Sequence, residues 1–223
     1  MTQQTPKPQA LSGQARTGTL PFSPQGWPYM IALLATTVIA YALSWTIPTI
    51  ISALLFLFVV NFFRDFERDI PQGDGLVICP ADGKVIRAEK TDTGLRVDIF
   101  MNVFDVHVNR APMSGKITAI TYIPGKFVNA SFDSASVDNE RNRFELETTD
   151  GLKIQFTQIA GLVARRIISY VKVGDEVQAG QRIGMIRFGS RVDCEIPEGF
   201  ELNVKVGDKV SSASTILARK ITS

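Results

Sequence analysis

The sequence has little histidine and cysteine, and this scarcity excludes several kinds of site. His107 is the single histidine in 223 residues, so a metal centre that needs two or three imidazole ligands is not expected. The two cysteines, Cys79 and Cys194, lie far apart and form no Cys-x-x-Cys pair. A zinc site or a disulfide framework is therefore not predicted, and the chain suits a reducing compartment. Any imidazole chemistry must take place at one position.

Charged residues are also missing from one long stretch of the chain. No Asp, Glu, Lys or Arg occurs between Arg16 and Arg64, and most of this stretch is apolar. The apolar run is longer than the roughly 20 residues that one membrane-spanning helix needs, and it is shorter than two full spans. Because proline interrupts helical hydrogen bonding, Pro48 divides the run into two predicted short helices, at 29–45 and 49–63.

We interpret this helical hairpin as membrane-associated, either dipping into one leaflet or forming a tight two-span hairpin. Lys7 and Arg16 precede the run, and Arg64 and Arg68 follow it. The positive-inside rule then places both ends, and the domain that follows, on the cytoplasmic face of the cell membrane. A buried core hairpin is the alternative, whereas a signal peptide is not favoured because the run is too long and begins too late. Residues 1–28 are predicted to form a flexible tail.

The remaining chain, 64–223, is predicted to form one β-rich domain. Runs with period-2 alternation, such as 96–101 and 153–159, are separated by Gly, Asp and Pro turns. The sequence VKVGDEV at 171–177 is nearly repeated as VKVGDKV at 204–210, and its Gly-Asp pair favours a tight hairpin. These repeats resemble the hairpins of lipoyl-like flattened barrels. The predicted fold class is mainly β, a small barrel or sandwich hybrid with an N-terminal helical membrane hairpin.

Three short segments carry candidate chemistry: CPADGKV at 79–85, DVHVNRAP at 105–112 and RFGSRV at 187–192. If the second segment is a strand, Asp105, His107 and Asn109 share one face. A lone histidine is more often a structural residue. Asp82 precedes a glycine and is, by itself, most simply a turn residue. Neither residue indicates catalysis alone.

The pair Gly189-Ser190 is distinguished by its position, because it follows an apolar strand and lies between the two repeats. The residues after it contain strands that would stay bound to the body if the chain were cut there. Taken in order, PADGKV, DVHVNRAP and FGSR resemble the phosphatidylserine decarboxylase family in its short form, over most of 50–223. The resemblance implies a proenzyme that cuts itself between Gly189 and Ser190 into a larger chain, 1–189, and a smaller chain, 190–223, which stay associated.

The same resemblance implies the cofactor and the reaction. Ser190 becomes a covalent pyruvoyl group that forms a Schiff base with phosphatidylserine of the membrane, and the products are phosphatidylethanolamine and CO₂. His107 is then the base and proton donor, and Asp82 orients it, in the logic of a Ser-His-Asp triad. Gly189 has no Cβ and leaves the scissile carbonyl accessible. No metal is predicted to take part.

One departure from the family pattern concerns the residue after this histidine segment. Long bacterial members carry a second histidine three residues after the first, where this chain has Arg110. An arginine cannot act as a base at neutral pH, so His107 serves both self-cleavage and decarboxylation, or another group takes one role. Arg110 is instead predicted to bind the substrate carboxylate or phosphate, as are Arg165 and Arg166.

Two alternatives stay open at this point. A membrane-anchored, lipoyl-like binding or adaptor module would explain the repeats but leaves Gly189-Ser190 and the DVH segment unexplained. A related pyruvoyl decarboxylase could act on another serine lipid or a free amino acid, although the apolar hairpin favours a lipid. With a net charge of +2, nucleic acid is not an expected partner, and a homo-oligomer is compatible with the sequence.

Overall fold

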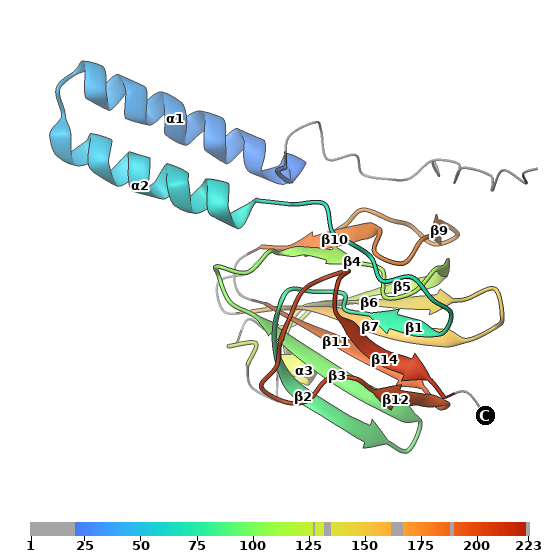
Figure 1. Ribbon diagram of the computed structural model, residues 1–223. Helices are drawn as coiled ribbons and strands as arrows, with labels where there is room; N and C mark the ends of the chain where they lie inside the picture. The colour runs from blue at the N-terminus through green and yellow to red at the C-terminus, as the bar shows by residue number, and fades with distance from the viewer. Residues whose placement is uncertain (1–20, 127, 132–134, 162–166, 188–189, 222–223) are drawn as a thin grey trace, which may run out of the picture.

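The computed structural model describes residues 21–126, 128–131, 135–161, 167–187 and 190–221. These residues form a helical hairpin and a β-rich body (Figure 1). The hairpin projects from one side of the body, and both of its helices meet the body at the same end. Most of the predicted tail lies outside the described residues. The part next to the hairpin forms a short 3₁₀ helix, η1 (Pro24–Gly26).

The two predicted helices are confirmed as α1 (Trp27–Ala42) and α2 (Thr46–Phe62), but the turn between them lies elsewhere. The prediction placed the break at Pro48. The chain instead turns at 43–45, where Ser44 adopts a left-handed φ of 58°. Pro48 lies in the first turn of α2, where its missing N–H would have no partner within the helix. The proline therefore fits the start of the second helix and does not break it.

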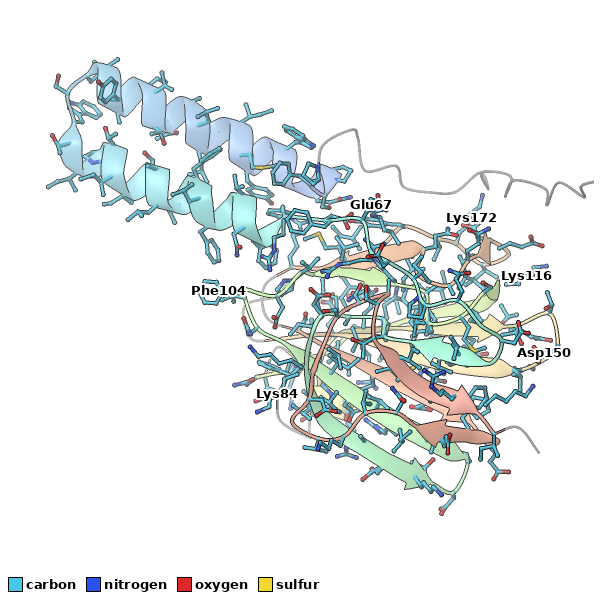
Figure 2. All side chains as sticks on the ribbon, viewed as in Figure 1. Glu67, Lys84, Phe104, Lys116, Asp150 and Lys172 are labelled. Atoms are coloured by element: carbon cyan, nitrogen blue, oxygen red, sulfur yellow. The ribbon has the colours of Figure 1, made fainter. Side chains whose placement is uncertain are left out.

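Both helices are apolar around most of their circumference, and they share a small polar contact. Thr37 Oγ1 donates a hydrogen bond to Ser52 Oγ at 3.0 Å between the helices. The large side chains that surround the pair are exposed (Figure 2). They include Ile31, Leu34, Val38, Ile39, Tyr41, Leu43, Trp45, Ile47, Ile50, Ile51, Leu54, Leu55 and Leu57. In the part of the chain that the structure describes, no helix is both long and apolar enough to cross a membrane.

The base of the hairpin packs on the body through its own apolar cluster. Phe62 and Phe63, at the end of α2, are buried together with Met30 of α1. They cluster with Met185, which belongs to strand β10 (Arg182–Ile186) of the body. Aromatic and thioether side chains bury large apolar areas, so this cluster fixes the base of the hairpin to the body.

The body is built from antiparallel strands, which confirms a mainly β fold. The strands are β1 (Leu76–Ile78), β2 (Gly83–Thr91), β3 (Gly94–Met101), β4 (Val108–Arg110), β5 (Gly115–Ile123), β6 (Arg141–Glu147), β7 (Lys153–Ala160), β8 (Ile167–Ser169), β9 (Glu176–Val177), β10, β11 (Ser190–Pro197), β12 (Phe200–Leu202), β13 (Lys209–Val210) and β14 (Ile216–Lys220). A short helix, α3 (Ala135–Asp138), precedes β6. The core contains the stacked rings of Phe144 and Phe156, 4.9 Å apart.

The order of the strands reveals an internal duplication. The large sheet runs β13-β2-β3-β11-β7-β6-β5-β9, and its two halves mirror each other about the boundary between β11 and β7. The two small sheets match in the same way, since β1-β14-β12 corresponds to β4-β10-β8. The second half is formed by one segment, 108–186. The first half is assembled from two segments that are distant in sequence, 76–101 and 190–220.

The repeated sequences occupy equivalent turns of the two halves. Gly174 and Gly207 have φ values of 95° and 99°, which glycine adopts without strain. Their N–H groups donate to the carbonyls of Ile117 and Val85, at 2.8 and 2.9 Å. The predicted tight turns are thus present, but the predicted hairpins are not. β9 follows the first turn and pairs with β5, and β13 follows the second turn and pairs with β2. In both cases the turn docks against the strand, distant in sequence, with which the next strand pairs.

A buried ion network ties the segment after α2 to the body. Asp65 is 2% exposed and accepts hydrogen bonds from Arg110 at 3.0 Å and from Arg182 at 2.6 Å. Arg110 also donates to the carbonyl oxygens of Phe66 at 2.8 Å and Gly180 at 3.1 Å. Both oxygens of the Asp65 carboxylate are paired with an arginine, so the network can stay buried. It holds the segment after α2 against β4 and β10.

We expect Arg110→Met to lower the free energy of unfolding by about 2–3 kcal/mol, because two carbonyls and one carboxylate oxygen lose a buried donor. Arg182 keeps Asp65 paired, which limits the loss. Urea unfolding in detergent measures the effect, in a Ser190→Ala background that prevents the expected self-cleavage. Arg219→Met, which removes an exposed arginine, is the control. Equal stability of the two variants would contradict this role of Arg110.

Candidate active site

Ser190 is the first residue of β11, the strand at the centre of the large sheet. It is fully buried, and its backbone pairs with Met101 of β3 on one side and with Ala160 of β7 on the other. Its Oγ donates to Met101 Sδ at 3.4 Å. A thioether sulfur is a weak acceptor, so the hydroxyl has no strong partner among the described residues that would compete with a reaction. The predicted cleavage residue Gly189 lies outside the described residues.

Two buried amides lie near this serine. Asn109 Nδ2 donates to the same Met101 Sδ at 3.7 Å, and Asn109 Oδ1 accepts a hydrogen bond from Gln158 Nε2 at 2.8 Å. Gln158 Oε1 is buried and has no hydrogen-bond partner among the described residues. Because Ala160 pairs directly with Ser190, period-2 alternation places the side chain of Gln158 on the same face of the sheet as Ser190. An unpaired buried oxygen is a position where an N–H donor would be stabilised.

The sequence patterns did not identify these amides as functional residues. Alternation predicted Asn109 on the face of His107, which was the only signal for it. Gln158 is one residue of an alternating strand, and no motif includes it. Gly184 makes room for this side chain, because a Cβ at position 184 would lie 2.9 Å from Gln158 Nε2. Such proximity between strands depends on the fold and has no local sequence pattern.

His107 is completely buried next to the base of the hairpin. Its Nδ1 donates to the carbonyl of Asp105 at 2.9 Å, and its Nε2 is buried and has no partner in the part of the chain that the structure describes. The ring of Phe62 lies 4.3 Å from the imidazole, between ring centroids. The pKa of His107 is lowered to about 4, mainly by burial and to a smaller extent by the positive charge of Arg64, against the opposing effect of the Asp105 carbonyl. The imidazole is therefore neutral at pH 7, with a lone pair on Nε2.

Asp82 does not form the predicted hydrogen bond with His107. Its Oδ2 accepts from Arg68 at 2.8 Å, and its Oδ1 accepts from the backbone N–H of Ser212 at 2.8 Å. The imidazole is oriented by the backbone of Asp105 instead, because that carbonyl already binds Nδ1. Burial raises the pKa of Asp105, and the nearby charge of Asp82 contributes to this increase. Asp82 thus lies close enough to influence the site electrostatically.

The predicted arginine contacts with the substrate find no support in the described residues. Arg110 is 4% exposed, and its guanidinium is bound by Asp65 and two backbone carbonyls. Burial lowers the pKa of Arg110, and the charge of Arg182 adds to this effect. Its position in the ion network gives it a structural role, and substrate binding by Arg110 stays a prediction. Arg165 and Arg166 lie outside the described residues.

The opposite face of β11 carries a buried cluster of charges. Arg191, next to Ser190, donates to the carboxylates of Asp98 on β3 and Asp193 on its own strand. Arg96 also donates to both carboxylates, to Asp98 at 2.9 Å and to Asp193 at 2.8 Å. Burial raises the pKa of Asp193 to about 7, and the charge of Asp98 raises it as well. The cluster fixes the strand immediately after Ser190 to its neighbour.

The fold and the site define a β-rich protein with a buried serine at the start of its central strand, two buried amides near that serine, and a buried neutral imidazole at the base of the hairpin. Comparison with known proteins narrows this class. The family model for phosphatidylserine decarboxylase matches residues 55–218. The chain belongs to this family, as the resemblance predicted, and it is an enzyme of a decarboxylase family.

Curated relatives agree over nearly their whole length. The phosphatidylserine decarboxylase proenzyme of Aromatoleum aromaticum is 47% identical over 203 residues, covering 87% of this chain and 93% of the relative. The proteins of the same name from Burkholderia ambifaria and Paraburkholderia phymatum are 45% and 44% identical over 205 residues, covering 87% of this chain and 94% of each relative. The adaptor alternative is therefore not supported.

The buried neutral His107 predicts a pH-dependent stability. Its folded pKa of about 4 lies below its ordinary value of 6.5, so the unfolded chain binds more protons between these values and stability falls as the pH drops through this window. The free energy of unfolding should therefore fall between pH 7.5 and pH 5. In the Ser190→Ala background, we expect His107→Gln to make this fall smaller by about 2 kcal/mol.

Urea unfolding of both proteins at the two pH values measures this difference. Asp193 has the opposite effect on the free energy of unfolding. Because its pKa is raised, the folded chain binds more protons than the unfolded chain below about pH 7, so this group adds stability as the pH falls. Both proteins contain it, so its contribution cancels in the comparison. A stability difference between the two proteins that is the same at both pH values would contradict the burial of a neutral imidazole.

Proposed function

We propose that this enzyme converts phosphatidylserine to phosphatidylethanolamine and CO₂, with a pyruvoyl group made from Ser190 by self-cleavage of the Gly189–Ser190 bond. The observation that carries the proposal is the position of Ser190. It begins the central strand, is fully buried, and has a hydroxyl bound only weakly, by a sulfur. The names of the relatives, which describe a proenzyme, are consistent with this processing.

The proposed self-cleavage begins when Ser190 Oγ attacks the carbonyl carbon of Gly189 and the peptide C–N bond breaks, which leaves an ester and a free amine. Removal of the Cα proton of Ser190 breaks the Cβ–Oγ bond, so the Gly189 carboxylate leaves and dehydroalanine remains. Its imine tautomer reacts with water, releases ammonia and leaves a ketone. A neutral imidazole such as His107 can accept the protons that these steps release.

The strand pairing supports the expectation that the two chains stay together after cleavage. The smaller chain, 190–223, contains β11 to β14. In the uncut protein β11 pairs with β3 and β7, β13 pairs with β2, and β14 pairs with β1, all of which belong to the larger chain. The ion pair from Arg191 to Asp98 joins the same two chains. A break before Ser190 leaves these contacts intact.

The residues around Ser190 suit a carbonyl cofactor and an amine substrate. The pyruvoyl group supplies a ketone that condenses with the substrate amine and accepts the electrons left by CO₂. Asn109 Nδ2 can donate to a carbonyl oxygen at this position, and Gln158 Oε1 can accept an N–H. His107 Nε2 carries a lone pair and can exchange a proton with the substrate. Its pKa of about 4 makes the imidazolium a better proton donor than that of an ordinary histidine.

We expect denaturing mass spectrometry of the purified protein to find two chains, 1–189 and 190–223, with a blocked, pyruvoyl-sized N-terminus on the smaller one. Reduction with cyanoborohydride in the presence of phosphatidylserine should add the mass of the amine to that chain. Ser190→Ala is the control and should remain one chain. A single uncut mass for the wild-type protein would rule out the cofactor proposed here.

The exposed apolar hairpin leads us to propose further that the enzyme is bound to the cytoplasmic face of the membrane. Its outward side chains are as apolar as the interior of a protein, and such a surface is unfavourable in water. Arg64 and Arg68 follow the hairpin and suit an anionic, cytoplasmic lipid surface. A lipid substrate would then reach the site at the base of the hairpin.

We expect Leu54→Asp, on the hairpin, to reduce flotation of the protein with phospholipid vesicles at least several-fold, because a carboxylate is costly to bury among acyl chains. Val206→Asp is the matched control, since Val206 is 61% exposed and Leu54 is 62% exposed, but Val206 lies in the turn before β13. Equal flotation of the two variants would show that the hairpin does not bind the membrane.

A further inference from the structure

Two arginines at the base of the hairpin differ from most arginines of the body in their partners. The arginines that form ion pairs with carboxylates are Arg68, Arg87, Arg96, Arg110, Arg182 and Arg191. Arg64 and Arg187 form no ion pair with any described residue. A guanidinium without a carboxylate, held in place by neutral groups, keeps its charge available for an anionic ligand.

Arg64 immediately follows the buried end of α2 and is held by oxygen atoms that carry no charge. It donates to the backbone and side-chain oxygens of Asn61, at 2.6 and 2.9 Å, and to the carbonyl of Phe104 at 2.6 Å. Phe104 is 67% exposed and projects from the edge of the body on the side of the hairpin (Figure 2). Arg64 is also close enough to His107 to influence it electrostatically.

Arg187, the residue after β10 of the body, contacts the same base at the other helix, α1. It donates to Tyr29 Oη of α1 at 2.8 Å, and its Nε is buried without a partner among the described residues. The ring of Tyr29 stacks on that of Phe63, next to Arg64, with centroids 5.8 Å apart. Arg187 also lies three residues before Ser190, a separation of at most about 11 Å along the backbone.

We infer that Arg64 and Arg187 bind the phosphodiester of the lipid substrate and so position its serine headgroup at the Ser190-derived group. The inference rests on the function proposed above. Guanidinium groups match phosphate oxygens in geometry and charge, and a buried, unpaired Nε is a donor that such an oxygen satisfies. Both arginines lie at the base of the apolar hairpin. If the hairpin enters one leaflet, its base lies at the level of the lipid phosphates.

Other arginines without carboxylate partners lack this placement. Arg141 and Arg143 also have a buried Nε with no partner among the described residues, but they belong to β6, which pairs with β5 and β7. In the described part of the chain neither contacts the hairpin, and Arg141 donates to the carbonyls of Val137 and Asn139. Arg219 is exposed on β14, and we use it as a control.

The test measures decarboxylation of dispersed short-chain phosphatidylserine by Arg64→Gln and Arg187→Gln beside Arg219→Gln. We expect each of the first two variants to raise KM roughly ten-fold or more, as loss of a charge-assisted hydrogen bond predicts, with kcat nearly unchanged. Arg→Lys at either position should restore part of the affinity. Unchanged KM values in both glutamine variants would overturn the inference.

Competition distinguishes the phosphodiester from other anions. Glycerophosphoserine should inhibit the wild type better than the glutamine variants, whereas free serine should inhibit all of them equally. A loss of inhibition by serine would assign the arginines to the substrate carboxylate instead. If KM in the dispersed assay is unchanged and only binding to phosphatidylglycerol vesicles falls, the arginines bind the lipid surface and the inference fails.

Failure of the proposed function would be visible separately. Denaturing mass spectrometry of each variant reports self-cleavage, which we expect to be complete in all of them. A wild-type protein that does not cut itself or release CO₂ would refute the proposed function. A wild-type protein that does both, with KM values unaffected by the two substitutions, would refute the phosphodiester site alone.

Discussion

The backbone pairing of β11 is the constraint on which the rest of this structure depends. The strand lies between β3 and β7 and bonds to both along its length, beginning at Ser190. Its alternation directs Ser190 toward the amides on one face and Arg191 into the buried charges on the other. Because an antiparallel ladder tolerates little displacement without losing several bonds at once, the start of this strand is fixed in space. The chemistry expected at Ser190 requires such a fixed position.

The internal duplication explains how the chain would remain one body after the proposed cut before Ser190. The second half of the fold is continuous in sequence, whereas the first half combines strands from before and after Ser190. A cut before Ser190 thus separates two segments that are already interleaved in one sheet. The repeated Gly-Asp turns keep this arrangement, since each docks its following strand on a partner from far away in the sequence.

The hairpin and the site share a boundary, and this has chemical consequences. Phe62 covers His107, and the resulting burial depresses the pKa of the imidazole. The same base carries Arg64 and Arg187, whose partners in the described residues are uncharged. An apolar surface, two available cations and a neutral base therefore meet at one place. This combination suits a substrate with acyl chains, a phosphate and an amino group.

Sequence patterns alone determined the helical hairpin, the mainly β body, the equivalent turns and the family, because apolar run length, alternation and ordered motifs are local properties of the chain. Only the tertiary structure decided that Pro48 lies in the first turn of a helix, that Asp82 binds Arg68, and that Arg110 binds Asp65. It also brought Gln158 to Asn109. These contacts join residues from different strands, and their geometry follows from packing and register, which no local pattern encodes.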